Sequence, residues 1–302
     1  MTPEEIAGRL QGRVHGSVLT RAPLGPYTTF RVGGPADVLV EAESEDDLRA
    51  VAEVAGDAPV AIVGRGSNLL VADDGFRGIA VRLGRSFRRH EATDTRLVLG
   101  GAVYLPAAAR LCVRLGLAGF EFAAEIPATF GGAVRMNAGA HERCMADVVS
   151  SARVVDLATG KARSLDVAEL GYDYRHSDLA PLDVVVEGTL ALERGDPDRI
   201  AERNAVHLRW RRETQPPGRS AGSVFKNPRG DSAGRLIDSV GAKGMRVGGA
   251  EISNVHANFI VADAGAKADD VWSLIGAVRT LVLERTGVAL EPEVRFLGSF
   301  VE

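Results

Sequence analysis

The chain of 302 residues is long enough for two modest domains, although its length alone also allows one large domain. Its content of 45% apolar and 25% charged residues is typical of a globular protein, and no apolar run approaches the roughly 20 residues that cross a bilayer. The formal net charge of −4 argues against a surface built as a whole for nucleic acid.

The first residues carry acidic side chains where a signal peptide would be positively charged, and no apolar h-region follows them. Two cysteines, Cys112 and Cys144, show no pairing pattern and are expected to be buried, reduced thiols. The histidines are scattered without the spacing of metal ligands, so no metal is expected. Together these features predict a cytoplasmic protein.

The first half of the sequence alternates strand-like and helix-like stretches. Ser44 offers an N-cap to a stretch that has acids in its first turn and ends at Gly56, which predicts a helix over residues 44–56. The other elements expected in this half are strands over 38–40, 59–63, 79–83 and 96–99, and a helix over 106–116.

The second half predicts the same mixture of elements. Expected are strands over 152–157, 183–192 and 293–296, and helices over 200–210 and 268–286. The polar, turn-forming stretch 193–198 suggests a domain boundary, which divides the chain into 1–195 and 196–302. Mixed strands and helices throughout favour an α+β enzyme over a bundle or a sandwich.

A glycine-rich turn is expected directly after the strand 59–63. It reads Gly64-Arg65-Gly66-Ser67-Asn68-Leu69-Leu70. Glycines at this place let the backbone turn tightly and approach a diphosphate with its N–H groups. A third glycine at the Rossmann spacing is missing, so a purely structural turn is an equally good interpretation.

A second stretch, residues 126–140, is dense in small residues. Small residues let the main chain pack flat against a large planar ligand, but they also suit a close-packed connection. The residue types favour neither interpretation over the other.

Three further segments carry charge. Arg175 could hold a carboxylate with two parallel hydrogen bonds, although a lone arginine in a loop is more often a surface residue. Residues 209–246 hold nine basic and three acidic side chains, a field that suits an anionic ligand or a solvated basic face. Ser223 lies in this stretch outside any Gly-x-Ser-x-Gly pattern, so a hydrolase is not supported. Glu293 and Arg295 share one face of a regular strand, where an ion pair is the alternative to a functional role.

Taken in this order, the segments resemble the UDP-N-acetylenolpyruvoylglucosamine reductase family, flavoenzymes of peptidoglycan precursor synthesis. The resemblance extends over nearly the whole chain, from residues 28–36 to 293–296. Its most specific parts are 66–70, 131–139, 222–228, 248–253 and 256–259. The chain departs from the family pattern at Ala128, Glu142 and Ala262.

The resemblance implies a two-part FAD-binding region of the vanillyl-alcohol-oxidase type followed by an α+β substrate-binding domain. It also implies the shorter form of the enzyme, because the stretch between Arg175 and Ser223 is too short for an extra tyrosine-bearing loop. The implied reaction belongs to cell-wall synthesis. NADPH is the reductant, and the enolpyruvyl group of UDP-N-acetylglucosamine enolpyruvate is reduced to give UDP-N-acetylmuramate.

The resemblance also carries roles onto matching residues. The implied catalytic residues are Arg175 and Glu293, which stabilise the developing negative charge, and Ser223, which donates the proton. The implied substrate-binding residues are Tyr174, Arg212, Lys226 and Asn227. The implied FAD-binding residues are Gly64, Arg65, Gly66, Ser67, Asn68, Leu69, Ile126, Pro127, Gly131, Gly132, Asn137, Ala138 and Gly139.

Two other functions remain open at this point. One is an oxidase on the same scaffold that reacts with dioxygen. Such enzymes often attach FAD through a histidine or cysteine near the first glycine turn, whereas Ser67 and Asn68 here predict a noncovalent flavin. The other is a non-catalytic binding module, against which the retained Arg175, Ser223 and Glu293 argue. A UDP-sugar and NADPH are the expected small-molecule partners, with no nucleic acid, membrane or obligate protein partner.

Overall fold

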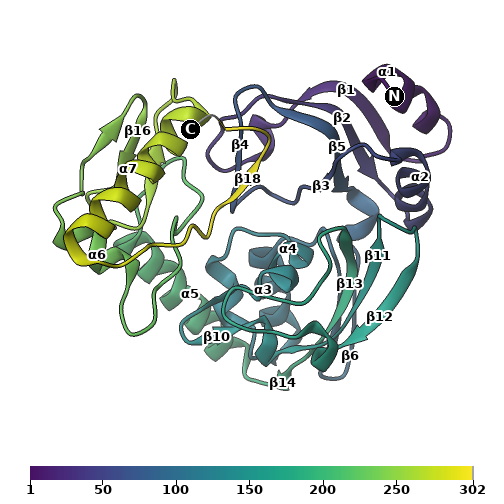
Figure 1. Ribbon diagram of the computed structural model, residues 1–302. Helices are drawn as coiled ribbons and strands as arrows, with labels where there is room; N and C mark the ends of the chain where they lie inside the picture. Colours follow the sequence, from purple (N-terminus) through teal and green to yellow (C-terminus); the bar gives the residue numbers. More distant parts are fainter. Residues whose placement is uncertain (301–302) are drawn as a thin grey trace. The chain divides into compact units, whose positions relative to one another are not determined.

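The computed structural model describes residues 1–300, and the chain divides into two compact units (Figure 1). Unit 1 comprises Met1–Thr20, Val38–Gly64 and Gly78–Arg211. Unit 2 comprises Arg21–Asp37, Arg65–Arg77 and the chain from Arg212 onward. Among the described residues, every helix is too short or too polar to cross a membrane.

Unit 1 contains two sheets. The four-stranded sheet has the order β1 (Ser17–Pro23), β2 (Pro35–Ala42), β5 (Phe76–Leu83) and β3 (Val60–Ile62). The five-stranded sheet is antiparallel throughout, in the order β12 (Ala162–Asp166), β11 (Val149–Asp156), β13 (Asp183–Ala191), β7 (Arg96–Gly100) and β6 (His90–Thr93). Two short pairs join β9 (Gly139–Ala140) to β10 (Arg143–Cys144) and β8 (Leu117–Ala118) to β14 (Glu193–Arg194).

Unit 1 also contains helices. They are α1 (Pro3–Leu10), α2 (Glu45–Ala55), α3 (Leu105–Leu115), α4 (Phe130–Arg135) and most of α5 (Pro197–Thr214). Short 3-10 turns are η2 (Arg85–Arg88), η3 (Glu121–Glu125), η4 (Met145–Asp147) and η5 (Val167–Leu170).

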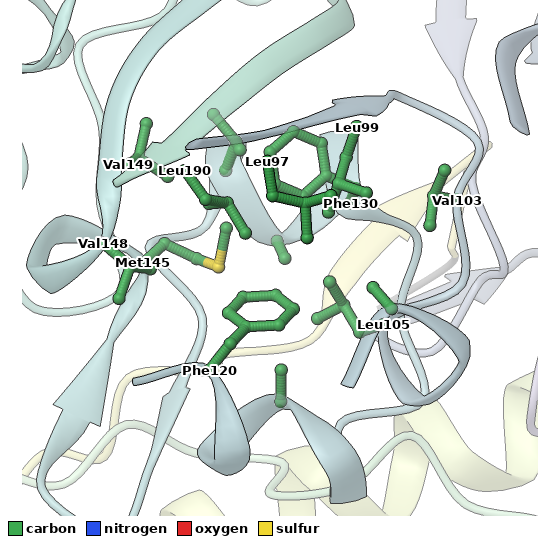
Figure 2. Close-up of a cluster of buried hydrophobic side chains, with 14 of the residues drawn as sticks. Leu97, Leu99, Val103, Leu105, Phe120, Phe130, Met145, Val148, Val149 and Leu190 are labelled. Carbon is green, nitrogen blue, oxygen red and sulfur yellow. The ribbon is translucent and has the colours of Figure 1, made fainter. Parts of the chain in front are cut away.

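Strand β13 of the five-stranded sheet is buried on both faces, whereas the edge strand β6 is exposed. Successive side chains of a strand point to opposite sides. On β13, Val184 and Val186 join a core formed with α1, α2 and the four-stranded sheet, whereas Val185 joins the core formed with α3, η3 and α4. Figure 2 shows side chains of this second core, in which Phe120, Phe130 and Met145 come together with Leu97 and Leu190.

Unit 2 is built from three separate stretches of the chain. It contains the sheet β15 (Arg246–Val247), β16 (Ala250–Ile252) and β17 (Ile260–Ala262), the helices α6 (Ala233–Ser239) and α7 (Ala268–Thr286), and the 3-10 turn η1 (Gly25–Tyr27). Helix α7 lies against β16. A parallel pair joins β4 (Leu69–Val71) to β18 (Arg295–Leu297). The carboxylate of Asp73 accepts the backbone N–H groups of Ala268 and Asp269 at 2.9 and 3.0 Å, and so caps the start of α7.

These connections explain why the compact units differ from the linear division at 195. The boundary rested on a change of composition along the chain, whereas β4 and Asp73 join unit 2 through contacts with residues far along the sequence. The assignment of 1–195 to flavin and 196–302 to substrate stays a prediction.

Most predicted elements are confirmed. Helix α2 starts at the Ser44 cap, which accepts the backbone N–H of Asp47, and α7 has the predicted bounds. Helix α3 ends at Gly116 in the left-handed conformation. Helices α1, α4 and α6 were not predicted, and the last strand begins at Arg295 instead of Glu293. Both thiols are free, but Cys144 is half-buried where a buried one was expected.

The carboxylate of Asp47 is fully buried in unit 1 and joins α2 to the start of β1. It accepts backbone N–H groups from His15, Gly16 and Glu43 at 3.0, 3.1 and 2.8 Å, and the hydroxyl of Ser44 at 2.7 Å. Burial alone would raise its pKa, but these hydrogen bonds outweigh burial and lower the pKa to about 2. Since the folded pKa lies below the unfolded one, this stabilisation is present above pH 4 and is lost as the pH falls towards 2.

We expect Asp47→Asn to lower the free energy of unfolding by about 2 kcal/mol at pH 7 and to flatten its dependence on pH between 4 and 2. Both carboxylate oxygens face donors, so the asparagine NH₂ group meets an N–H whichever way it turns. Urea unfolding at several pH values measures the effect, with the exposed Asp57→Asn as the control. An unchanged pH dependence in Asp47→Asn would remove this carboxylate from the role.

Candidate active site

The first glycine turn and the second glycine-rich segment meet in unit 1. A Cβ atom added to Gly64 would lie 2.8 Å from Oγ1 of Thr129, so a larger residue at this position would displace the Thr129 side chain. Thr129 also caps α4, where its hydroxyl accepts the backbone N–H of Gly132 at 3.4 Å. Gly64 and Thr129, from the two segments that the family resemblance assigns to FAD, are therefore neighbours within one unit.

The remainder of the turn lies in unit 2 and requires glycine at Gly66. Its φ is +58°, and an added Cβ would lie 2.4 Å from the carbonyl oxygen of Tyr27. The carbonyl of Gly66 accepts the backbone N–H of Thr29 at 3.2 Å. Within residues 1–300, the backbone N–H groups of Gly66, Ser67 and Asn68 donate to no protein acceptor. Adjacent unused donors of this kind fit a diphosphate such as that of FAD.

Asn68 connects this turn to the segment that carries Glu293. Its Nδ2 donates to the carbonyl of Glu293 at 3.0 Å, and its own carbonyl accepts the N–H of Arg295 at 3.0 Å. Its Oδ1 is buried and has no hydrogen-bond partner within the described part of the chain. A buried acceptor without a partner is costly, so this oxygen fits a donor supplied by a bound ligand.

The glycines within residues 126–140 differ in the contacts that an added side chain would make. An added Cβ at Gly131 would lie 2.8 Å from the carbonyl oxygen of Val185, and at Gly139 it would lie 2.4 Å from that of Arg143. These two glycines are therefore required by the packing of the protein itself. At Gly132 the nearest atom would be Oγ1 of Thr129 at 3.2 Å, so this exposed glycine leaves a low surface that fits a flat ligand.

The side chain of Asn137 forms hydrogen bonds to two other backbone segments of unit 1. It is 6% exposed, its Nδ2 donates to the carbonyl of Asp173 at 3.0 Å, and its Oδ1 accepts the N–H of Ala146 at 3.0 Å. Its expected contact with FAD stays a prediction, and any such contact would use the backbone of Asn137 or a rearranged side chain.

Arg175 lies at the tip of the tight turn that begins at Asp173, the residue to which Asn137 donates. Asp173 and His176 close the turn with reciprocal backbone hydrogen bonds of 3.3 and 3.1 Å. Arg175 adopts a φ of +55°, which is uncommon for a residue with a side chain, and its Nη2 donates to the carbonyl of Gly139 at 3.1 Å. Tyr174, which is 50% exposed, has its ring centroid 5.2 Å from the guanidinium carbon. The predicted site residues Tyr174 and Arg175 therefore lie in contact on the same turn.

A buried acid–imidazole contact flanks the second segment and was not predicted. Nε2 of His141 lies 3.0 Å from Oε1 of Glu125, near enough for an ion pair but not aligned for a hydrogen bond. The His141 ring stacks on that of His207 at 3.9 Å, and Arg211 donates to the Glu125 carbonyl. Burial raises the pKa of Glu125 and lowers that of His141, so both shifts favour uncharged forms.

In unit 2, hydrogen bonds place Ser223 and Glu293 on neighbouring segments. The backbone N–H of Glu293 donates to the carbonyl of Val224 at 2.7 Å, directly after Ser223. Both predicted residues are half-buried, and the Ser223 hydroxyl has no protein partner within residues 1–300. A hydroxyl in this state can donate its proton to a ligand.

The predicted substrate-binding residues of unit 2 lie nearby in the chain. Nζ of Lys226 pairs with Oε1 of Glu291 at 2.6 Å, and its backbone N–H donates to the carbonyl of Glu291 at 2.9 Å. Oδ1 of Asn227 accepts the N–H of Ala233 at the start of α6, at 3.0 Å. Arg212 also belongs to unit 2, whereas Arg175 and Tyr174 belong to unit 1.

Comparisons with known proteins identify the family of the chain. Residues 36–166 match the family model of an FAD binding domain, and residues 214–297 match that of the UDP-N-acetylenolpyruvoylglucosamine reductase C-terminal domain. The UDP-N-acetylenolpyruvoylglucosamine reductase of Moorella thermoacetica is 43% identical over 97% of this chain and 97% of its own. That of Anaeromyxobacter sp. is 45% identical over 96% of this chain and 92% of its own.

A solved structure shows the same overall fold. The crystal structure of UDP-N-acetylenolpyruvylglucosamine reductase from Thermus caldophilus superimposes with a TM-score of 0.81 at 38% identity, covering 94% of this chain and 99% of the other. The predicted α+β fold, with its FAD-binding region and C-terminal reductase domain, is therefore confirmed. The chain belongs to the UDP-N-acetylenolpyruvoylglucosamine reductase family.

Proposed function

We propose that this chain uses NADPH and noncovalently bound FAD to reduce the enolpyruvyl group of UDP-N-acetylglucosamine enolpyruvate to the lactyl group of UDP-N-acetylmuramate. The proposal includes a cytoplasmic location. The observation that carries it is the hydrogen bond from Glu293 to Val224, which holds two proposed catalytic residues on adjacent segments. The Ser223 hydroxyl beside this bond has no protein partner within residues 1–300, as a proton donor to a ligand requires.

FAD would be held by the proposed residues within 64–69 and 126–139 and would supply the hydride chemistry when bound. The residues of the chain must then manage the charge that develops next to the substrate carboxylate. The planar guanidinium of Arg175 can form two parallel hydrogen bonds to that carboxylate. Fixed donors aimed at developing charge are usually the largest catalytic contribution.

Ser223 donates its hydroxyl proton to the carbon that bears the developing charge. A serine hydroxyl is a weak acid, so it depends on accurate positioning and on nearby charge. Glu293 is proposed to assist charge stabilisation with Arg175. Lys226, Asn227, Arg212 and Tyr174 are proposed to bind the substrate, and the basic stretch 209–246 favours its phosphates.

The test is NADPH oxidation by purified holoenzyme with and without the enolpyruvyl substrate. We expect rapid NADPH oxidation only with substrate, and one UDP-N-acetylmuramate formed for each NADPH consumed. A non-catalytic binding module gives no stimulation, and an oxidase consumes dioxygen instead of forming this product. Either result contradicts the proposed function.

A further inference from the structure

A buried asparagine, Asn258, holds the segment that carries Ser223. Its side chain is 3% exposed and bonds to both backbone groups of Phe225, with Nδ2 donating to the carbonyl at 2.8 Å and Oδ1 accepting the N–H at 3.0 Å. Its own carbonyl accepts the N–H of Val224 at 2.9 Å. One residue therefore satisfies three of the four backbone groups of Val224 and Phe225.

The fourth group is held from the opposite side. The carbonyl of Val224 accepts the N–H of Glu293 at 2.7 Å, and the side chains of Val224 and Phe225 are 1% exposed in the unit 2 core. The segment thus lies between Asn258 on one side and the segment of Glu293 on the other. Its two buried peptides have every polar group satisfied, as buried backbone requires.

On the other side of Ser223, Ala221 is buried in the unit 2 core, but Gly222 lies between it and Ser223. Gly222 has a φ of +77°, and a Cβ added to it would meet nothing within 4 Å. A glycine in open space leaves the backbone free to turn. The position of the Ser223 hydroxyl therefore depends on the peptides that follow it and on the β-bridge that pairs Ser223 with Phe259, the residue after Asn258.

We propose that Asn258 is a positioning residue for Ser223, which fixes the proton donor by holding the Val224 and Phe225 peptides. The inference rests on the proposed role of Ser223 in the reaction. Asparagine suits the task because its amide offers a donor and an acceptor side by side, like a strand partner. Aspartate has the same shape but no donor when ionised, so its oxygen would face the carbonyl of Phe225.

The test uses Asn258→Asp in the full-length holoenzyme, with Asn254→Asp as the matched control. Asn254 lies in the same loop, is exposed, and bonds through Nδ2 to Glu251 at 3.1 Å. Under anaerobic conditions, stopped-flow absorbance measures flavin reduction by NADPH and flavin reoxidation by the enolpyruvyl substrate. Each variant is also combined with Ser223→Ala, and the substrate dissociation constant is measured by perturbation of the flavin spectrum.

We expect Asn258→Asp to slow reoxidation by about 10–100-fold, because small misplacement of a reacting group is costly. Flavin reduction and the substrate dissociation constant change less than about twofold, and the solvent isotope effect on reoxidation rises. In the Ser223→Ala background, Asn258→Asp adds little, because it acts through the missing hydroxyl. The control leaves every rate unchanged.

If Asn258→Asp slows reoxidation equally in the parent protein and in Ser223→Ala, or leaves reoxidation unchanged, the role of Asn258 is overturned. Unchanged reoxidation in Ser223→Ala alone instead overturns the role of Ser223, so the two failures are distinguishable. If Asn258→Asp does not fold with FAD bound, Asn258→Ser replaces it. Serine keeps a donor and an acceptor on a shorter side chain, and the same expectations and contradictions apply to it.

Discussion

We expect Ser223→Ala to slow reoxidation of the reduced flavin by the enolpyruvyl substrate by about 10²–10⁴-fold, the usual contribution of a general acid. The reason is that the methyl group cannot supply the proton to the carbon that bears the developing charge. Reduction of the flavin by NADPH stays near normal, because that step needs no proton from Ser223. Stopped-flow absorbance near the flavin band separates the two half-reactions.

Ser239→Ala is the control for this substitution. Ser239 is exposed in unit 2, and its hydroxyl bonds only to the carbonyl of Leu236 in its own helix α6. We expect both half-reactions to be unchanged in this control. Equal reoxidation rates in Ser223→Ala and the parent protein would assign the proton to another group.

We expect Arg175→Lys to slow the same reoxidation step by about 10²-fold. An ammonium keeps the positive charge but lacks the planar fork that holds both carboxylate oxygens, and it cannot reproduce the bond to the carbonyl of Gly139. Arg175→Ala is expected to be slower still, because it removes the charge as well. Single-turnover reoxidation over a range of substrate concentrations measures both variants.

The control for Arg175 is Arg143→Lys in the same unit. Arg143 is exposed and pairs with Asp147 at 3.2 Å, an interaction that contributes little at a surface. We expect no change in either half-reaction. A normal rate in Arg175→Ala would contradict the assignment of charge stabilisation to this residue.

Local signals predicted the elements that local chemistry controls. Helix α2 was predicted from its Ser44 cap and α3 from Pro106 and Gly116, because caps and left-handed glycines act within a few residues. The short helices α4 and α6 lack a long amphipathic pattern, so they were missed. Unit 2 could not be predicted from local signals, because β4 reaches it through pairing with a distant strand.

In the candidate site, too, some features could be predicted from the sequence and others depend on contacts between distant residues. Residue types and family resemblance selected Ser223 and Glu293, and the structure places them on hydrogen-bonded segments. Neither the resemblance nor the residue types indicated how Asn68 and Asn137 use their side chains, since both bond to backbone far along the chain. Asn258 lay within a recognised motif, but only its two bonds to Phe225 suggest a role.

The pairing of β4 with β18 has a consequence for the synthesis of the protein. Asn68 and Glu293, which precede these strands, are 225 residues apart, a stretch that a ribosome needs roughly 10–50 s to translate. During that interval the glycine turn has neither its neighbouring strand nor the carbonyl that Asn68 holds. The turn therefore takes its final shape only after the residues of β18 have been synthesised, and we expect a cofactor held by this turn to bind after that point instead of guiding the earlier steps of folding.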